Sequence, residues 1–151
     1  MDLTPLDPAL KYGAGAILLH GSEMLLQQRS ETEHEPLTWS IYGGMVERGE
    51  TLSQAMLREV REESGIDVSA FTHQHLHRYT EPGFEFHTYV VWMPHRATPV
   101  HSTETNDAGW FCLGSTPDTL WQGLPSPLHS GFLQLTAETA LRTRLLSFLA
   151  R

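Results

Sequence analysis

Residues 43–66 read GGMVERGETLSQAMLREVREESGI. Thr51, with Gln54 three residues later, forms a capping-box pattern, in which each side chain satisfies a backbone N–H of the other residue. Gly65 is the residue type that most often follows the last turn of a helix, because glycine adopts the left-handed conformation without strain. The stretch therefore predicts a helix that begins after Thr51 and ends at about Ser64.

The second half of this predicted helix carries three glutamates within five residues, Glu59, Glu62 and Glu63. Like charges at these spacings repel one another and weaken a helix. At about 100° of rotation per residue, the glutamates fall on the same side as the apolar residues. Arg58 and Arg61 fall on the outward half, from which Arg58 can still reach a carboxylate outside the helix. The apolar residues that define the buried side are Leu52, Ala55, Met56 and Val60.

Unpaired carboxylates beside a buried face are costly, so arginines or bound cations must relieve the repulsion. Hard divalent cations fit best, since Mg²⁺ takes oxygen ligands and usually keeps waters and substrate phosphates in its shell. The alternative interpretation is that these are surface acids whose placement on the helical wheel is accidental.

The spacing of nine residues in this stretch resembles the Nudix box, G-x5-E-x7-R-E-U-x-E-E-x-G-U, where U is a bulky aliphatic residue. The residues that match its fixed positions are Gly44, Glu50, Arg58, Glu59, Val60, Glu62, Glu63, Gly65 and Ile66. The resemblance implies the Nudix fold, an α/β (α+β) architecture with a mixed β-sheet sandwiched between helices. It also implies hydrolysis of a nucleoside diphosphate linked to another moiety, assisted by Mg²⁺ or Mn²⁺.

The resemblance assigns roles to residues by their position. It makes Glu59, Glu62, Glu63 and the carbonyl of Gly43 metal ligands, and it makes Glu50 and Arg58 a supporting pair that orients the loop and the helix. Members of the family often take a further carboxylate from a loop before the last strand. The two candidates here are Glu104 and, behind it, Asp107. The general base is then Glu62 or Glu104. Tyr42 stands where many members have proline, so the local backbone is expected to be less rigid.

The rest of the chain predicts one domain over residues 13–151, after a proline-containing lead of residues 1–12. Apolar runs and turn signals predict strands and a final helix. The strands are expected at 13–20, 24–29, 39–42, 71–80, 84–93 and 109–113, with a polar loop at 98–108, a connection at 116–127 and the helix from about 128 to 150.

Composition narrows the class of function. The chain of 151 residues has a formal net charge of -8 and a single lysine, Lys11, which argues against binding of long nucleic acids. No membrane partner is expected, because the sequence shows neither a bilayer-spanning apolar run nor a signal-peptide pattern. The only cysteine, Cys112, fits a reducing cytoplasm. Its Trp-Phe-Cys-Leu context predicts a buried strand and a structural role.

A small-molecule nucleotide substrate needs a surface on which its base stacks. The aromatic candidates are Trp39, Tyr42, Tyr79, Phe84 and Trp92, for each of which a core position is the alternative. The segment 79–84 resembles one in ADP-ribose-type Nudix enzymes, with Pro82 at the corresponding spacing, although a proline in a hairpin turn needs no functional reason. The compact chain instead suits nucleoside-triphosphate hydrolases. Both substrate classes stay open, and either is compatible with a homodimer.

His73, His75 and His77 alternate along a predicted strand, which would place them on one face together with Tyr79. A zinc site would need further ligands, such as His87 on the partner strand. The favoured interpretation is a polar strand face or the lining of a substrate cleft, because closed zinc sites usually show cysteine or paired histidine spacings.

A competing function from another class is a catalytically silent Nudix domain that binds a nucleotide as a sensor. Such domains usually lose carboxylates of the box, and all of them are present in this sequence. The enzyme is therefore the preferred interpretation.

Overall fold

The computed structural model describes residues 6–132 and 139–150. The strands are β1 (Lys11–His20), β2 (Glu23–Arg29), β3 (Trp39–Ser40), β4 (Tyr42–Met45), β5 (His73–Glu81), β6 (Phe84–Trp92) and β7 (Thr105–Cys112). The helices are α1 (Leu52–Ser64) and α3 (Thr139–Leu149). Among the described residues, no helix has the length and apolarity needed to cross a membrane.

β1 is the central strand of a mixed sheet. β6 runs parallel along one edge of β1, from the Lys11–Phe84 pair to the Leu19–Trp92 pair. The other edge is shared, since β4 pairs antiparallel with the first half of β1 and β2 with the second half. β2 also pairs with β3 and β7, and β5 pairs with β6. The short β3–β4 segment thus passes from β2 to β1 and leads directly into the loop before α1.

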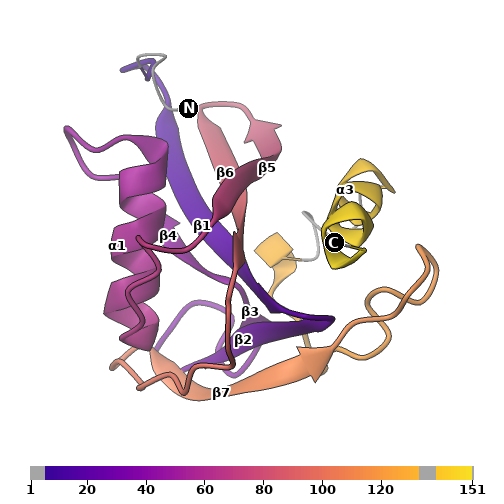
Figure 1. Ribbon diagram of the computed structural model, residues 1–151. Helices are drawn as coiled ribbons and strands as arrows, with labels where there is room; N and C mark the ends of the chain where they lie inside the picture. Colours follow the sequence, from indigo (N-terminus) through magenta and orange to yellow (C-terminus); the bar gives the residue numbers. More distant parts are fainter. Residues whose placement is uncertain (1–5, 133–138, 151) are drawn as a thin grey trace.

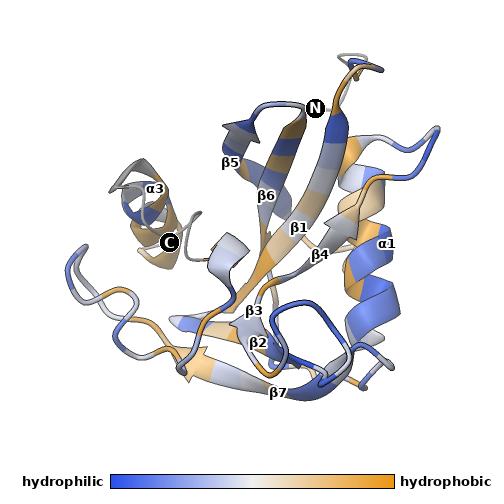
Figure 2. Cartoon of the chain, turned by 180° about the vertical axis from the view of Figure 1, so that it is seen from behind, coloured by the Kyte–Doolittle hydropathy of each residue, from blue (hydrophilic) through white to orange (hydrophobic). Residues whose placement is uncertain are grey.

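Two hydrophobic clusters lie on opposite faces of this sheet, each under a helix. Ile17 and Leu19 of β1 belong to the cluster that includes residues of α3. Ala16 and Leu18, which alternate with them, belong to the cluster that includes residues of α1. α1 and α3 accordingly lie on opposite sides of the strands (Figure 1), and α1 is largely hydrophilic on its outward side (Figure 2). The expected sandwich of a mixed sheet between helices is confirmed.

Some element boundaries differ from those expected. β1 begins at Lys11 instead of residue 13, so the end of the lead belongs to the sheet. β7 begins at Thr105, within the expected loop, because pairing with β2 orders its polar first half. The final helix was expected from about residue 128; residues 130–132 are helical, and α3 spans Thr139–Leu149. Leu128 instead bridges to Trp39, and residues 133–138 of the expected helix lie outside the described residues.

A β-bulge interrupts β5. The register with β6 pairs His75 with Tyr89 but His77 with Thr88, so Leu76 is an extra residue in β5. An extra residue inverts the alternation of side chains beyond it. Arg144 of α3 donates to the backbone oxygen of Leu76 at 2.8 Å, which ties the bulge to the helix that covers this face.

The bulge divides the histidines of β5 between the two faces of the sheet. The rings of His73 and His75 lie 6.3 and 5.3 Å from that of Tyr89, on the face that α1 covers. His77 is buried beyond the bulge, and Tyr79 packs against the cluster on the opposite face. The expectation that all four share one face is wrong, because strict alternation holds only in an uninterrupted ladder.

Cys112 ends β7 and is exposed, so its predicted buried position is wrong. Phe111 and Leu113 contribute to the cluster that includes α3. These neighbours flank Cys112 on both sides, so the alternation of a strand turns the cysteine away from that cluster.

Candidate active site

α1 begins and ends as the sequence predicts. The Thr51 hydroxyl accepts a hydrogen bond from the Gln54 backbone N–H at 3.2 Å, and the Gln54 side chain accepts one from the Thr51 N–H at 2.9 Å. Gly65 has a φ of 74° and donates its N–H to the Arg61 oxygen at 2.8 Å. These caps fix both ends of the helix, whose second half carries the three glutamates over β1 and β4.

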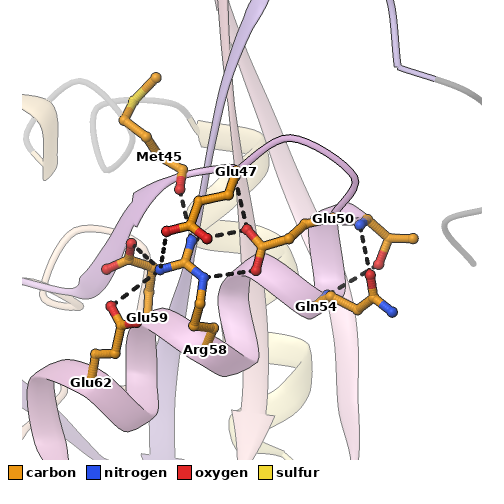
Figure 3. Close-up of polar contacts among 8 residues, drawn as sticks. Met45, Glu47, Glu50, Gln54, Arg58, Glu59 and Glu62 are labelled. Carbon is orange, nitrogen blue, oxygen red and sulfur yellow. Dashed lines mark hydrogen bonds and ion pairs between the residues drawn. The ribbon is translucent and has the colours of Figure 1, made fainter.

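Arg58 and Glu50 form the supporting pair (Figure 3). Arg58 donates to the two carboxylate oxygens of Glu50, from Nε at 2.7 Å and from Nη2 at 2.9 Å. Nη2 also donates to the backbone oxygen of Met45 at 2.9 Å. This bidentate geometry is the strong form of an arginine–carboxylate contact. The Arg58 bonds hold the pKa of Glu50 below its usual range, and they link the loop before α1 to the helix.

Arg58 also contacts two of the candidate ligands. Its Nη1 donates to Glu59 at 2.8 Å and to Glu62 at 3.1 Å. The helical wheel placed the Arg58 Cα correctly on the outward half, but the expectation that this arginine points away from the helix acids is wrong. Its long side chain folds back along the helix, and only 15% of it is exposed.

The three glutamates differ in burial. Glu63 is buried, and the Glu59 side chain is 14% exposed, so both adjoin the core as expected. The Glu62 side chain is 55% exposed, which corrects the expectation that all three abut the buried face. Glu62 is the most peripheral of the three on the wheel, so a modest rotation of the helix turns it to solvent.

Glu63 is the most constrained of the acids. Its carboxylate accepts hydrogen bonds from the Gln27 side chain at 2.9 Å and from the Gly43 N–H at 2.8 Å. Burial, together with the nearby charges of Glu59 and Glu104, raises its pKa to about 8, against the effect of these two donors. A buried carboxyl group with two donors and two acidic neighbours is well placed to accept a cation.

Gln27 was missed by sequence reasoning. It is buried in β2 and links Glu63 to β7, because its amide oxygen accepts a hydrogen bond from the Thr105 hydroxyl at 2.8 Å. The amide nitrogen also contacts the Ile41 backbone oxygen at 3.3 Å. The available signal was a glutamine directly after an apolar run in a predicted strand, since a buried amide needs partners.

Glu59 lies over the backbone of Gly44. A Cβ built at position 44 would come within 2.5 Å of the Glu59 carboxyl carbon, so only glycine leaves room for this carboxylate. Burial raises the pKa of Glu59 against the hydrogen bond from Arg58, and Glu62 and Glu104 raise it further.

Glu104 stands in the segment before β7, as expected of the loop acid. Its backbone oxygen accepts a hydrogen bond from the Ser30 N–H at 3.0 Å. Its charge acts on both Glu59 and Glu63, which brings this distant residue to the acids of α1. Asp107, the second candidate, accepts instead from the adjacent Ala108 N–H at 2.8 Å.

The donor set suits a hard divalent cation, because the side-chain candidates all offer carboxylate oxygens. No three acidic or histidine side chains form a ready-made cage in the part of the chain that the structure describes. Arg58 engages both Glu59 and Glu62, so a cation would compete with its guanidinium for these oxygens. The residues fit Mg²⁺ or Mn²⁺ in chemistry and require a local change of side-chain position.

The aromatic candidates do not gather at one surface. Trp39 lies in β3 and meets Phe111 edge-on, with ring centroids 5.2 Å apart. Tyr79 and Phe84 lie on the β5–β6 hairpin, at the other end of the strand order. Trp92, at the end of β6, packs against the cluster that includes α3. A base that stacks on Trp39 therefore does not also contact Tyr79 or Phe84.

Tyr42 has no surface on which a base could stack. Its side chain is fully buried in the cluster under α1, and its hydroxyl has no hydrogen-bond partner among the described residues. Burial raises the pKa of this phenol well above its usual range, and the charge of Glu63 adds to the effect. The structure places Tyr42 in the core and not at a ligand surface.

Comparison with known proteins identifies relatives of this chain. A model of the NUDIX domain matches residues 9–129. The NAD-capped RNA hydrolase NudC of Vibrio atlanticus (strain LGP32) is 31% identical over 97 residues, which are 64% of this chain and 35% of that protein. The 8-oxo-dGTP diphosphatase of Proteus vulgaris is 40% identical over 63 residues, 42% of this chain and 56% of that protein. The chain thus spans about a third to a half of the length of these relatives.

Solved structures show the same fold. The NUDIX domain of Shewanella oneidensis NrtR, complexed with ADP ribose, superposes with a TM-score of 0.66 at 22% sequence identity. The match covers 93% of this chain and 94% of that one. At this identity the likeness extends to the fold alone.

Proposed function

The chain belongs to the NUDIX domain family, and we propose that it hydrolyses the diphosphate linkage of a nucleoside diphosphate derivative with the help of Mg²⁺ or Mn²⁺. The observation that carries the proposal is the convergence of four carboxylates from two distant segments. The charge of Glu104 acts on both Glu59 and Glu63, the charge of Glu59 acts on Glu63, and that of Glu62 acts on Glu59. A protein with a net charge of -8 can bind a polyanion at such a place only through cations.

When bound, a divalent cation neutralises charge on the phosphate oxygens and helps to ionise or position the attacking water. The residues of the chain hold and orient it. Glu59, Glu62, Glu63 and Glu104 supply side-chain ligands, and the carbonyl of Gly43 is a further candidate. Gln27 and the Gly43 N–H fix the orientation of the Glu63 carboxylate.

Arg58 and Glu50 act as positioning residues. Their bidentate pair joins the loop that follows β4 to the acidic half of α1. The base that accepts a proton from water is Glu62 or Glu104, whose carboxylates are the more exposed of the four. Arg58 bonds the Glu62 carboxylate, whereas the Glu104 carboxylate has no such partner among the described residues. A variant at each position distinguishes the two roles, because loss of a metal ligand and loss of the base have different kinetic effects.

The test combines a substrate panel with two isosteric variants. The panel contains dNTPs, 8-oxo-dGTP, ADP-ribose, NADH, dinucleoside polyphosphates and nucleotide sugars, with Mg²⁺ or Mn²⁺ and identification of the products. We expect turnover of at least one nucleotide, and a loss of roughly a hundredfold in kcat in Glu62→Gln and Glu63→Gln. Arg61→Gln, on the exposed side of α1, is the matched control.

Two results would contradict the proposal. Near-normal kcat in both glutamate variants would remove these carboxylates from the reaction. No turnover of any nucleotide, together with tight binding of one, would favour the silent sensor domain. Glu104→Gln adds a further distinction, because replacing a ligand raises the Mg²⁺ requirement, whereas replacing the base lowers kcat at saturating Mg²⁺.

A further inference from the structure

A cavity of about 1220 Å³ lies beside the candidate active site. It is lined by residues of the lead and the start of β1 (6–8 and 10–12), by the loop and helix start (45–52), and by four side chains of the β5–β6 hairpin. It adjoins the acids directly, because Arg58 bonds both Met45 and Glu50 of its lining as well as Glu59 and Glu62. The volume exceeds that of a typical small-molecule pocket.

The hairpin side chains form a continuous polar wall of this cavity. Arg78 donates to both oxygens of Glu85, at 3.1 and 2.6 Å. The same carboxylate lies 3.0 Å from His87 Nε2, and His87 Nδ1 lies 2.8 Å from His75 Nε2. Since a carboxylate only accepts, His87 donates to it from Nε2; in the neutral form of His87, Nδ1 then accepts from His75 Nε2. Each neighbour thus orients the next.

The bulge in β5 creates this wall. Arg78 pairs with His87 in the ladder, and His75 pairs with Tyr89. His87 and Tyr89 are two residues apart and share a face of β6, so Arg78 and His75 share it too. In an uninterrupted strand, residues 75 and 78 would point to opposite faces, and Leu76 is the extra residue that brings them together.

The acidic and basic side chains that line the cavity differ in whether they have hydrogen-bond or ion-pair partners. The four acids all have partners: Asp7 accepts from the Ala9 N–H at 2.9 Å, Glu47 lies 3.7 Å from Arg58, Glu50 is bonded by Arg58 and Glu85 by Arg78. In contrast, the side chains of Lys11 and Arg48 form no hydrogen bond or ion pair with any described residue. Two cations without a side-chain partner among the described residues therefore line a cavity in which each acid already has a hydrogen-bond or ion-pair partner.

From this arrangement we propose that the cavity binds a phosphate group that the substrate carries beyond the hydrolysed linkage, with Lys11 and Arg48 as its charged contacts. This rests on the proposed function for the position of the linkage itself. Phosphate groups are bound by lysine and arginine through charge-assisted hydrogen bonds. The substrate class is then a nucleoside polyphosphate with a terminal phosphate, in preference to a nucleoside diphosphate that ends in an uncharged sugar such as ADP-ribose.

The first test measures binding without turnover, in EDTA and without divalent metal, so that the repulsive carboxylates of the active site do not hold the probe. Calorimetric titration of the whole protein with inorganic pyrophosphate should give saturable binding. Its Kd should rise roughly tenfold in Lys11→Gln and in Arg48→Gln, and remain unchanged in Arg61→Gln. The imidazole NMR signals of His75 and His87 should shift during the titration, which locates the probe. Both substituted residues lie at the surface, and thermal unfolding confirms that the variants fold.

The second test measures selectivity. The ratio of kcat/KM for dGTP to that for ADP-ribose should fall about tenfold in Lys11→Gln and Arg48→Gln. Absence of pyrophosphate binding, equal affinity in all variants, or binding that leaves the His75 and His87 signals unmoved would overturn the proposal. So would an unchanged selectivity ratio in an active enzyme. If no nucleotide is hydrolysed, the proposed function fails, and the metal-free titration still decides whether the cavity binds phosphate.

Discussion

The carboxylate of Glu59 lies directly over the backbone of Gly44, where a Cβ would come within 2.5 Å of the carboxyl carbon and 2.6 Å of Oε1. Glycine 44 therefore serves the site by leaving room for a side chain of α1. Gly43 serves the fold, since a Cβ there would meet the Gly15 Cα at 2.7 Å and the Ala14 oxygen at 2.8 Å.

Gly44→Ala should separate activity from stability. The new methyl group meets the far end of a flexible side chain, so Glu59 moves aside at little cost to the fold, but its carboxylate leaves the position in which it can serve as a ligand. We expect a Tm within a few degrees of the parent and a loss of at least about tenfold in Mg²⁺-dependent kcat/KM. Circular dichroism melts and steady-state kinetics measure the two quantities.

Gly43→Ala is the matched comparison, because it adds the same methyl group one residue earlier. Here the clash is with backbone atoms of β1, which cannot yield, so we expect a loss of about 1–3 kcal/mol in the free energy of unfolding. Equal stability of the two variants would contradict the close packing of β4 on β1.

Gln27→Leu should weaken metal binding through Glu63. The substitution removes the amide that donates to Glu63 and accepts from Thr105, so each of these two buried polar groups loses one of its hydrogen-bond partners. We expect a loss of about 1–3 kcal/mol in stability and a rise of roughly tenfold in the Mg²⁺ concentration for half-maximal activity. Urea unfolding and Mg²⁺ titration of activity measure these effects. Gln74→Leu, at an exposed position of β5, is the control, and an equal Mg²⁺ requirement in both variants would show that Gln27 does not orient Glu63.

The Glu50–Arg58 pair should make folding stability depend on pH in acid. The pKa of Glu50 is lowered mainly by the hydrogen bonds from Arg58. A carboxyl group with a lowered folded pKa stabilises the fold above its unfolded pKa, about 4.3, and this contribution is lost as the pH falls through the folded value. We expect the free energy of unfolding to fall less steeply below about pH 4.3 in Glu50→Gln than in the parent protein.

The control variant for this pH prediction replaces a carboxylate that has no arginine partner. Glu33→Gln, at a position whose side chain forms no ion pair in the described residues, should keep the slope of the parent protein between pH 5 and pH 3, as measured by urea unfolding in metal-free buffer. Parallel pH profiles of Glu50→Gln and the parent would show that the pair contributes nothing to folding.

Tyr42→Phe should be neutral or stabilising. The Tyr42 hydroxyl is buried without a hydrogen-bond partner among the described residues, so its removal eliminates a desolvated polar group while the ring keeps its packing. We expect a gain of zero to about 1 kcal/mol in the free energy of unfolding and an unchanged KM. A loss of stability would reveal a partner for the hydroxyl, such as an ordered water.

Much of the fold and of the acid set follows from local patterns. The caps of α1 at Thr51 and Gly65 could be predicted because capping uses residues within one turn of each other. The position of β1, β2 and the β5–β6 hairpin followed from apolar runs bounded by turn residues. Glu104 could be proposed only through the resemblance to other members of the family, since it lies 41 positions after Glu63 in the chain.

The sequence by itself predicted the candidate acids of the site and determined the helix, α1, that carries three of them. Tertiary structure decided which of these residues are buried, that Arg58 turns back to its neighbouring acids, and that Gln27 and Thr105 support Glu63. It also decided that a single extra residue, Leu76, places Arg78 on the same face as His75, where both line the cavity. The physical reason is that helix caps and periodicity depend on neighbours in the chain. Burial, strand register and long side-chain contacts depend on segments that meet only when the sheet forms.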